Sequence, residues 1–443
     1  MKIAFLPIDN RPVCYTLPKI IAGIDENIEF SIPERSQLGD LTKTADIDAL
    51  FKWLEDLPAQ DTIILSLDTL VYGGLIPSRR GKETIDELKL RLEKLKKNLQ
   101  GKGAKIYAFS SIMRISNNNF NEEEKEYWSD YGKKIFEYSY ELHKNGSAQT
   151  DVPPEIIKDY LDTRERNFEV NKIYLEWQKE GIFEFLVFSK DDCAQFGLNV
   201  KEAQELEKLG AFTKTGADEI PLSLLSRSLN KSMKIYPEFL MPKYKNLISN
   251  YEDVSVEDSV RGQIELAGCE VCPDKDSADL ILYVNNFIEH QGEIVMDVDT
   301  KTFGGKFVTP DKPYMIADVR FANGSDNAFV KELFKNKFDD NFYGYSAWNT
   351  TANTLGSLIC GAKFRFFAKK YNKENFTKLQ VTRFLDDWAY QANVRQMLKK
   401  TDDNELSLLM REFEPVVADA LDTKIDVKYS YPWHRLFEVE IWI

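Results

Sequence analysis

The chain has 443 residues, of which 43% are hydrophobic, so it is long enough for two or three globular domains with ordinary cores. Its formal net charge of −14 argues against a nucleic-acid partner, because phosphates attract basic surfaces. Five cysteines provide no disulfide framework, and no stretch approaches the roughly 18 apolar residues of a membrane-spanning helix. We therefore expect a cytoplasmic protein with no membrane contact.

The first hundred residues alternate short apolar runs with amphipathic stretches. Residues 2–7 have the pattern of a strand rather than of a signal peptide, since they lack a long apolar run and a cleavage site. Between two later runs, Thr84 and Glu87 predict a helix that starts with a capping box, and Gly101 ends it. The other apolar runs predict strands covered on both faces, as in a parallel sheet, at 28–32, 62–67 and 105–109.

Helices are predicted to dominate the next stretch. Asn121 is followed by three glutamates, which favour a helix N-terminus, so a helix is expected to start there and to end near Gly146. Residues 154–181 predict another helix, which leads to a strand at 183–188. The sequence is helical again from 221 to about 234.

The second half restarts the alternation of strands and helices. Strands are predicted at 269–272, 278–284, 314–319, 342–345, 424–431 and 437–443, and helices at 256–267, from about 326, at 352–370 and across most of 378–413. The expected domains are an N-terminal α/β domain (1–235), a second α/β domain (236–375), and a helical segment with a strand tail (376–443). We predict an α/β protein of two Rossmann-like halves with mostly parallel sheets, with an irregular β/α barrel as the alternative.

Polar residues follow most of the predicted strands. In open α/β sheets, ligands bind beyond the carboxyl ends of the strands, so these residues are the candidates for a site. Turn and capping preferences of Asp and Asn are the competing explanation for each residue singly. The candidates are Asp9 and Arg11, then Asp68, Tyr72 and Arg79, then Arg114, Asp191, Asp192, Asn285, Asp318, Asn323, Trp348 and Asn349.

Seven stretches carry a resemblance to a known family. They are LPIDNRP (6–12), SLDTLVYGGLIPSR (66–79), DDCAQFG (191–197), GADE (216–219), ADVRFANGSD (317–326), WNTTANTLG (348–356) and PWHRLF (432–437). Together they resemble the bacterial domain-of-unknown-function family numbered 4127 over nearly the whole chain. The first motif of that family reads Asp-Asp-Arg-Pro, whereas this chain has Asn10. The resemblance implies neither a reaction nor catalytic residues.

Several common chemistries lack their sequence signatures. The three histidines have no zinc-ligand spacing, and a single CxxC at Cys269 and Cys272 lacks a second pair. The glycines at 74 and 81 are spaced too widely for a phosphate loop, and no GxGxxG follows the first strand. The GxSxG motif of serine hydrolases is also missing. No cofactor is therefore predicted.

After these exclusions, the chemistry that the candidate residues could support is that of carboxylates. We predict that Asp9 and Asp191 act as an acid and base pair supported by Asp68, the arrangement of glycosidases. Alternatively, the same aspartates bind Mg²⁺ or Mn²⁺. Asp192 adjoins Asp191, and in an extended segment both side chains could not face one point, so Asp192 is assigned to substrate binding or to a structural contact.

The remaining candidates are assigned to the substrate. Arg11, Arg79 and Arg114 suit an anionic group, although neutralising the clustered aspartates explains them equally well. Trp348 and Tyr72 suit stacking on a sugar ring or packing in the core. Asn349 suits an oxyanion or a helix cap.

We expect a hydrolase acting on a small carbohydrate, an amino or acidic sugar, with its site between the two halves. A Mg- or Mn-dependent hydrolase or lyase and a non-catalytic metabolite-binding protein are the alternatives. Activity that survives EDTA would argue against the metal alternative, and ligand binding without turnover would favour the binding protein.

Overall fold

The computed structural model describes residues 1–443, and these residues form two compact units. Unit 1 comprises residues 1–10, 29–221 and 251–253, and unit 2 comprises residues 11–28, 222–250 and 254–443. The main change of unit falls within helix α9 (Ile220–Ser228), upstream of the boundary predicted at 235. Residues 376–443 group with the rest of unit 2.

Unit 1 is built on a six-stranded sheet in which every pairing is parallel, in the order β2-β1-β3-β4-β5-β6. The predicted apolar runs form β1 to β5, whereas the short strand β6 has the polar sequence Thr-Lys-Thr and was not predicted. Strands β3 and β4 are buried along nearly their whole length, as expected for a sheet covered on both faces. The strands are β1 (Lys2–Leu6), β2 (Glu29–Ser31), β3 (Thr62–Ser66), β4 (Lys105–Ile112), β5 (Phe185–Lys190) and β6 (Thr213–Thr215).

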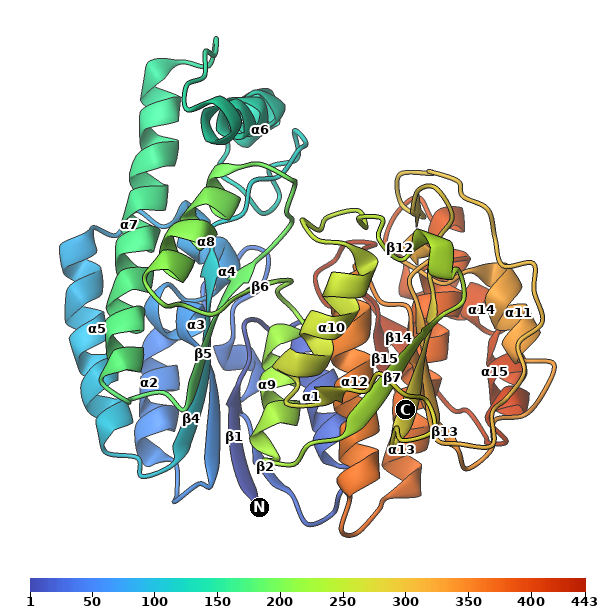
Figure 1. Ribbon diagram of the computed structural model, residues 1–443. Coiled ribbons are helices and arrows are strands. Elements are labelled where there is room, and N and C mark those ends of the chain that lie inside the picture. The colour runs from blue at the N-terminus through green and yellow to red at the C-terminus, as the bar shows by residue number, and fades with distance from the viewer. The chain divides into compact units, whose positions relative to one another are not determined.

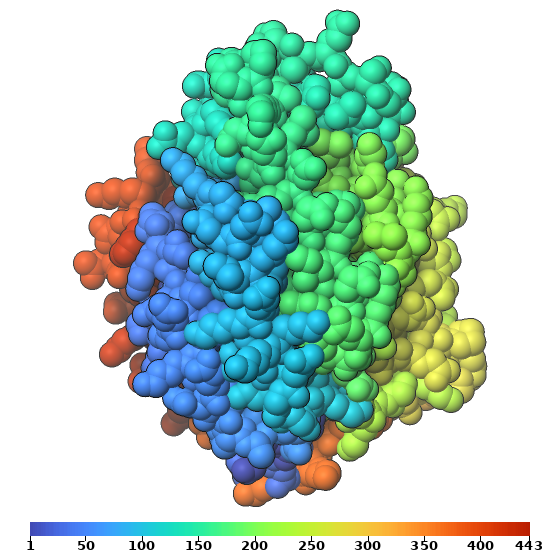
Figure 2. All heavy atoms as spheres, turned by 90° about the vertical axis from the view of Figure 1, so that its left-hand side faces the viewer, coloured from blue at the N-terminus to red at the C-terminus, as the bar shows by residue number.

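Helices pack against this sheet, and Figure 1 shows α2, α5 and α7 together on one side of β4 and β5. The same helices form much of the surface that Figure 2 shows in blue to green. Helix α5 begins with the predicted capping box, in which Thr84 and Glu87 bond each other's backbone N–H groups. The helices of unit 1 are α2 (Ile47–Asp56), α3 (Leu67–Val71), α4 (Leu75–Arg80), α5 (Ile85–Gln100), α6 (Trp128–Asn145), α7 (Pro154–Lys179) and α8 (Leu198–Lys208), with a short 3-10 turn at Arg35–Gln37.

The predicted helix start at Asn121 is wrong. Helix α6 begins at Trp128, and residues 121–127 form turns instead. The acidic run lies ahead of the helix and binds arginine side chains, so its charge serves tertiary contacts rather than the helix dipole. The predicted end of this helix is confirmed, because Gly146 adopts a left-handed φ of 75° as its C-cap.

Unit 2 contains a second parallel sheet, in the order β13-β11-β9-β7-β8. Numbered along the chain within each unit, both sheets begin 2-1-3-4-5, so the two halves share one strand order. This agrees with the predicted Rossmann-like halves. The strands are β7 (Lys234–Phe239), β8 (Glu270–Val271), β9 (Leu280–Asn285), β11 (Tyr314–Asp318) and β13 (Phe342–Ser346), with small pairs formed by β10 (Gly292–Glu293) and β12 (Phe321–Ala322) and by β14 (Lys428–Ser430) and β15 (Glu440–Trp442).

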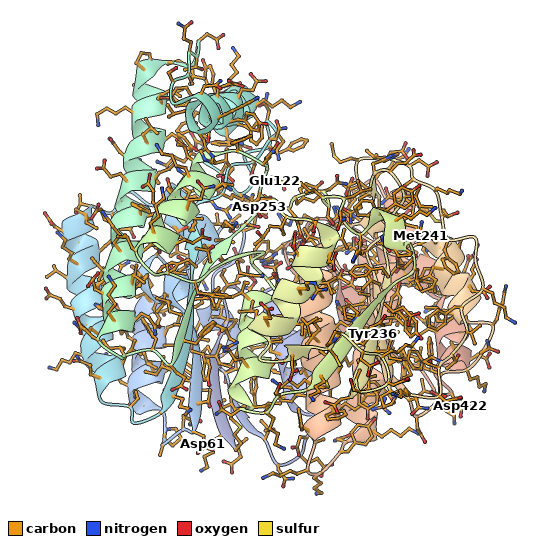
Figure 3. All side chains as sticks on the ribbon, in the orientation of Figure 1. Asp61, Glu122, Tyr236, Met241, Asp253 and Asp422 are labelled. Carbon is orange, nitrogen blue, oxygen red and sulfur yellow. The ribbon has the colours of Figure 1, made fainter.

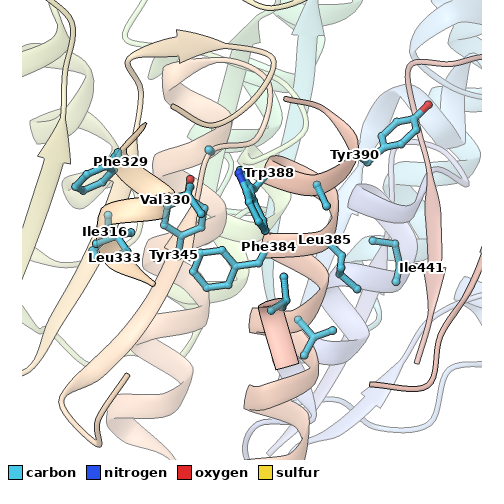
Figure 4. Packing of buried hydrophobic residues seen from close by; sticks show 14 of the residues in the cluster. Ile316, Phe329, Val330, Leu333, Tyr345, Phe384, Leu385, Trp388, Tyr390 and Ile441 are labelled. Atoms are coloured by element: carbon cyan, nitrogen blue, oxygen red, sulfur yellow. The ribbon is translucent and has the colours of Figure 1, made fainter. Parts of the chain in front are cut away.

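The pleat of these strands divides the apolar side chains of unit 2 between two cores. In β9, Ile281 and Tyr283 enter one core, whereas Leu280, Leu282 and Val284 enter the other, because alternate side chains point to opposite faces. Figure 4 shows the first core, in which the rings of Tyr345 and Phe384 stack with centroids 4.5 Å apart. Helices α10 and α12 contribute to the second core.

The helices of unit 2 include one rare type. Residues Phe384–Tyr390 form a π-helix directly after α13, within the stretch predicted to be largely helical. The other helices are α1 (Pro12–Ala22), α10 (Val256–Leu266), α11 (Asn327–Leu333), α12 (Thr351–Phe367), α13 (Lys373–Arg383), α14 (Asp403–Met410) and α15 (Glu414–Ala420), with 3-10 turns at Pro242–Tyr244 and Val394–Met397. None of the helices in either unit combines the length and the apolar character needed to cross a membrane.

Candidate active site

The carboxyl ends of the unit 1 strands lie along one edge of the sheet, because all its strands run in one direction. Asp9 follows β1, Asp68 follows β3, Arg114 follows β4 and Asp191 follows β5. The strand order reverses between β1 and β3, which is where ligands bind in sheets of this order. In Figure 3, Glu122 and Asp253 lie near this edge, and Asp61 lies at the opposite one.

Two arginines and four carboxylates form a cluster at this edge. The Arg114 guanidinium lies 2.9 Å from Glu123 and 2.9 Å from Glu124, and its Nη1 lies 3.2 Å from Asp191 and 3.3 Å from Asp192. The second arginine also contacts three of these acids, with Arg79 Nη2 3.0 Å from Asp191 and Arg79 Nη1 3.4 Å from Glu124 and 3.6 Å from Glu123. We call these six residues the carboxylate cluster: Arg79, Arg114, Glu123, Glu124, Asp191 and Asp192.

The cluster opens to solvent on the side of its aspartates. The Asp192 side chain is 35% exposed and that of Asp191 is 17% exposed, whereas Arg79 and Glu124 are almost completely buried. A small molecule could therefore reach the two aspartates but not the inner charges. Because Arg79 and Glu124 are buried, the surrounding protein holds them in place beneath Asp191 and Asp192.

Asp191 and Asp192 face the same point, contrary to the expectation for an extended segment. The segment is not extended, because Asp192 has a left-handed φ of 42°. This conformation is uncommon for a non-glycine residue, although aspartate and asparagine adopt it more readily than most. Both carboxylates contact Arg114 Nη1, so their Oδ2 atoms can be separated by at most about 6.5 Å.

The electrostatic surroundings distinguish one member of the pair. Burial in this loop and the negative charge of Asp191 raise the pKa of Asp192 to about 7. Burial disfavours the charged form of Arg114, but the carboxylates around it prevail and raise the pKa of its guanidinium well above the ordinary value. Near neutral pH the protonated form of Asp192 is therefore more populated than is usual for an aspartate.

Asp68 lies behind the cluster and is buried. Its carboxylate accepts a hydrogen bond of 2.8 Å from the Ser111 N–H and one of 3.4 Å from the Ser110 hydroxyl. Burial raises the pKa of Asp68 to about 6, although these hydrogen bonds favour the charged form. With 1% of its surface exposed, Asp68 joins the ends of β3 and β4 rather than meeting a substrate.

Asp9 and Tyr72 occupy different surroundings. Asp9 is 6% exposed after β1, and three strand spacings of about 4.8 Å separate the ends of β1 and β5 by roughly 14 Å. That distance favours Asp192 over Asp9 as the partner of Asp191. Tyr72 is buried beneath the Arg166 guanidinium, 5.5 Å from its ring centre, so its ring packs in the protein.

Arg11 belongs to unit 2, where it precedes helix α1 as its N-cap residue. Its guanidinium lies 5.1 Å from the ring centre of Trp433. This cation–π contact places it with the PWHRLF stretch of the tail, in a different unit from the carboxylate cluster.

The carboxyl ends of the unit 2 strands form a second polar group, which is fully buried. Asn285 donates a hydrogen bond of 2.8 Å to Asp318, and Arg320 donates bonds of 2.8 and 3.1 Å to the Asn285 oxygen. Asp326 lies 3.2 Å from Arg320 and donates its N–H to Asp318. We call Asn285, Asp318, Arg320 and Asp326 the buried network, and all four are 0% exposed.

Burial and the charge of Asp326 raise the pKa of Asp318 to about 7. The Tyr345 hydroxyl also donates a hydrogen bond of 3.1 Å to Asp318, so the carboxylate has partners on both oxygens. The structure thus brings Asn285 and Asp318 into contact and surrounds them with protein.

The other candidates of unit 2 lie beside this network. Asn323 and Asn349 both have left-handed φ angles, of 60° and 54°, and the Asn323 N–H donates a hydrogen bond of 2.8 Å to the Asn349 carbonyl. The helix cap is Thr350, whose side chain accepts from Asn353, so Asn349 precedes the cap. Trp348 is 3% exposed, and its ring meets Phe437 edge-on at 6.1 Å.

Sequence reasoning missed two groups of residues. Glu123 and Glu124 were assigned to a helix start, and only the tertiary structure shows that they bind Arg79 and Arg114. In unit 2, Asp386 and Asp387 lie on the π-helix beside Arg383, and burial raises the pKa of both. The sequence signal for Asp386 and Asp387 was that two adjacent acids lie within an otherwise apolar stretch, residues 384–390.

The carboxylates of the cluster surround the guanidinium groups of Arg79 and Arg114, which occupy the position that a metal ion would take. No group of three or more His, Cys, Asp or Glu side chains is arranged to hold a metal ion. The aspartate oxygens of the cluster that face solvent can accept hydrogen bonds from a bound molecule.

The fold and this cluster define an α/β protein of two parallel-sheet units with an acid-rich site at a strand edge. The chain belongs to the family described as protein of unknown function DUF4127, whose model matches residues 3–442. The resemblance seen in the sequence is thereby confirmed. No curated protein matches the chain.

Proposed function

We propose that the protein is a hydrolase of small carbohydrates that uses Asp192 as the acid and Asp191 as its carboxylate partner. The observation that supports this proposal most is the contact of both carboxylates with Arg114 Nη1. Two carboxyl groups that share a site and differ in protonation can protonate a leaving oxygen and attack or activate water on the same bond. Their separation of at most about 6.5 Å is closer to the retaining than to the inverting arrangement.

The charge of the cluster indicates the class of sugar. Four carboxylates surround two guanidinium groups, and both guanidinium groups are engaged by these acids. An acidic sugar would meet excess negative charge, whereas hydroxyl or ammonium groups can donate to the carboxylate oxygens that face solvent. This favours a neutral or amino sugar over the acidic sugar that the sequence left open.

The proposed reaction assigns distinct tasks to the cluster. Asp192 gives its proton to the oxygen of the departing group while the glycosidic bond breaks. Asp191 attacks the anomeric carbon, and water later releases the sugar as Asp192 takes up a proton. Arg114 holds both carboxylates at one point, and Arg79 fixes the position of Asp191 through its ion pair.

A panel of aryl glycosides with neutral, amino and acidic sugars tests this proposal, with EDTA or added Mg²⁺ and Mn²⁺ as parallel conditions. We expect turnover of neutral or amino glycosides that EDTA leaves unchanged. Asp192→Asn should lower turnover about 10²- to 10⁴-fold, the usual contribution of a general acid.

The matched control is Asp162→Asn, which changes an exposed aspartate of helix α7. It should leave turnover unchanged. Full turnover by Asp191→Asn and Asp192→Asn, or strict dependence on a divalent metal, would contradict the proposal. Binding of the glycosides without turnover would favour a metabolite-binding protein instead.

A further inference from the structure

Residues 251–253 form a short strap that belongs to unit 1, although the residues on both sides of it belong to unit 2. The Tyr251 carbonyl accepts a hydrogen bond of 3.0 Å from the Cys193 N–H. Asp253 lies 2.5 Å from the Lys190 ammonium group, and its other oxygen accepts a hydrogen bond from the Thr215 hydroxyl. Three separate contacts therefore attach this strap to strands β5 and β6 and to the loop after β5.

The contacts of the strap bracket the two aspartates of the carboxylate cluster. Lys190 is the last residue of β5 and immediately precedes Asp191, and Cys193 immediately follows Asp192. The strap thus holds the chain on both sides of the pair. A left-handed φ of 42° at Asp192 is uncommon for a non-glycine residue, and the contacts on both sides of the pair help to hold it.

The ion pair within these contacts is largely buried. The side chains of Lys190 and Asp253 are 10% and 9% exposed, so neither has water to replace its partner. Removing one partner of such a pair leaves a buried charge uncompensated, which displaces the chain around it. The hydrogen bonds and ion pair of Asp253 are with Lys190 and Thr215, not with Asp191 or Asp192.

We propose that Asp253 is a positioning residue that keeps Asp191 and Asp192 together through Lys190 and the strap. This inference rests on the proposed function of the pair.

Cysteine labelling tests the strap without any substrate. All five cysteines are buried, and Cys193 is covered where the strap meets the loop. In Asp253→Asn, the rate of maleimide labelling at Cys193, measured by peptide mass spectrometry, should rise by about tenfold or more through local opening. Cys269 and Cys360, in unit 2, serve as internal controls and should keep their rates.

A double variant keeps this test decisive if the single variant folds poorly. Lys190→Met with Asp253→Asn removes the ion pair and leaves no unpaired charge, so the fold is preserved while the strap is released. Cys193 should again label faster than in the parent protein. Unchanged Cys193 labelling in the double variant would overturn the proposal.

A second readout separates positioning from simple packing. The pKa of the Asp192 carboxyl, followed by carbon-13 NMR, should fall toward its ordinary value in Asp253→Asn, because the pair separates when the loop relaxes. An unchanged pKa of Asp192 would overturn the positioning role. Neither readout uses turnover, so failure of the proposed reaction would leave both results interpretable.

Discussion

The carboxylate cluster of unit 1 and the buried network of unit 2 occupy equivalent places, at the carboxyl ends of parallel strands in sheets of the same order. Both contain an aspartate whose pKa is raised to about 7, Asp192 in the first and Asp318 in the second. They differ in access, since Asp192 is 35% exposed and Asp318 is 0% exposed. The ratio of acids to arginines is the same in both, with four acids and two arginines in the cluster and two acids and one arginine in the network.

This difference shows that a raised pKa alone does not identify a reactive group. In unit 2 the raised pKa of Asp318 belongs to a network whose polar atoms bond one another, and the network joins β9, β11 and the start of α11. In unit 1 the same kind of shift occurs where solvent can enter. Solvent access therefore distinguishes the cluster of unit 1, to which we attribute the proposed chemistry, from the buried network of unit 2.

The largest expected effect concerns the buried network. Arg320→Met leaves the buried carboxylates of Asp318 and Asp326 without their cation, and the free energy of unfolding should fall by about 3–5 kcal/mol. Chemical denaturation measures this loss. Arg261→Met, which removes an exposed arginine of α10, is the matched control and should change stability by no more than about 0.5 kcal/mol. Equal losses in the two variants would remove the distinction between buried and open sites.

The next effect concerns the pH dependence of stability. The pKa of Asp68 is about 6 in the folded protein and 3.8 in the unfolded chain, so the folded state binds more protons between these values. The free energy of unfolding therefore falls as pH rises through this range. Asp68→Asn should remove that part of the slope, which amounts to about 2 kcal/mol between pH 4 and pH 8. Denaturation curves with identical pH slopes for variant and parent would contradict the assignment.

A smaller effect should appear within the acid pair. The charge of Asp191 raises the pKa of Asp192 and the charge of Arg114 lowers it, so substitutions at these positions should act in opposite directions. Asp191→Asn should lower the pKa of Asp192 by about one unit, and Arg114→Gln should raise it. Carbon-13 NMR titration measures both. Shifts of the same sign would show that the carboxyl responds to general loosening rather than to its neighbours.

The smallest expected effect concerns Asn349. Its φ of 54° favours asparagine or glycine, so Asn349→Gly should change stability little, whereas Asn349→Val should cost about 1–2 kcal/mol. Thermal unfolding of the two variants measures the difference. Loss of ligand binding in the stable glycine variant would give the Asn349 side chain the substrate role that the sequence suggested.

Much of the fold could be predicted from the sequence because hydrophobic periodicity is a local property. The buried strands β3 and β9 are continuous apolar runs, and Thr84 with Glu87 marks a helix start that the structure reproduces. The rule that ligands bind at the carboxyl ends of strands also located Arg79, Arg114 and Asp191, which do come together.

The composition of the site could not be predicted, because it depends on tertiary contacts. Glu123 and Glu124 look like helix-starting acids until Arg79 and Arg114 are seen beside them. The pairing of Asp191 with Asp192 depends on the left-handed backbone conformation of Asp192, and no pattern of side chains in the sequence predicts that conformation. Asp318 is buried because residues distant in the sequence pack over the end of its strand, and the sequence of the strand alone does not predict which residues these are.

Carboxyl labelling with a water-soluble carbodiimide and an amine tests the central claim most directly, since the reagent needs a protonated carboxyl that it can reach. At pH 6, peptide mapping should show modification of Asp192 and none of Asp318, and the reaction at Asp192 should decline above pH 7. Modification of Asp318 at the same rate, or resistance of Asp192 throughout, would contradict the assignment of chemistry to unit 1.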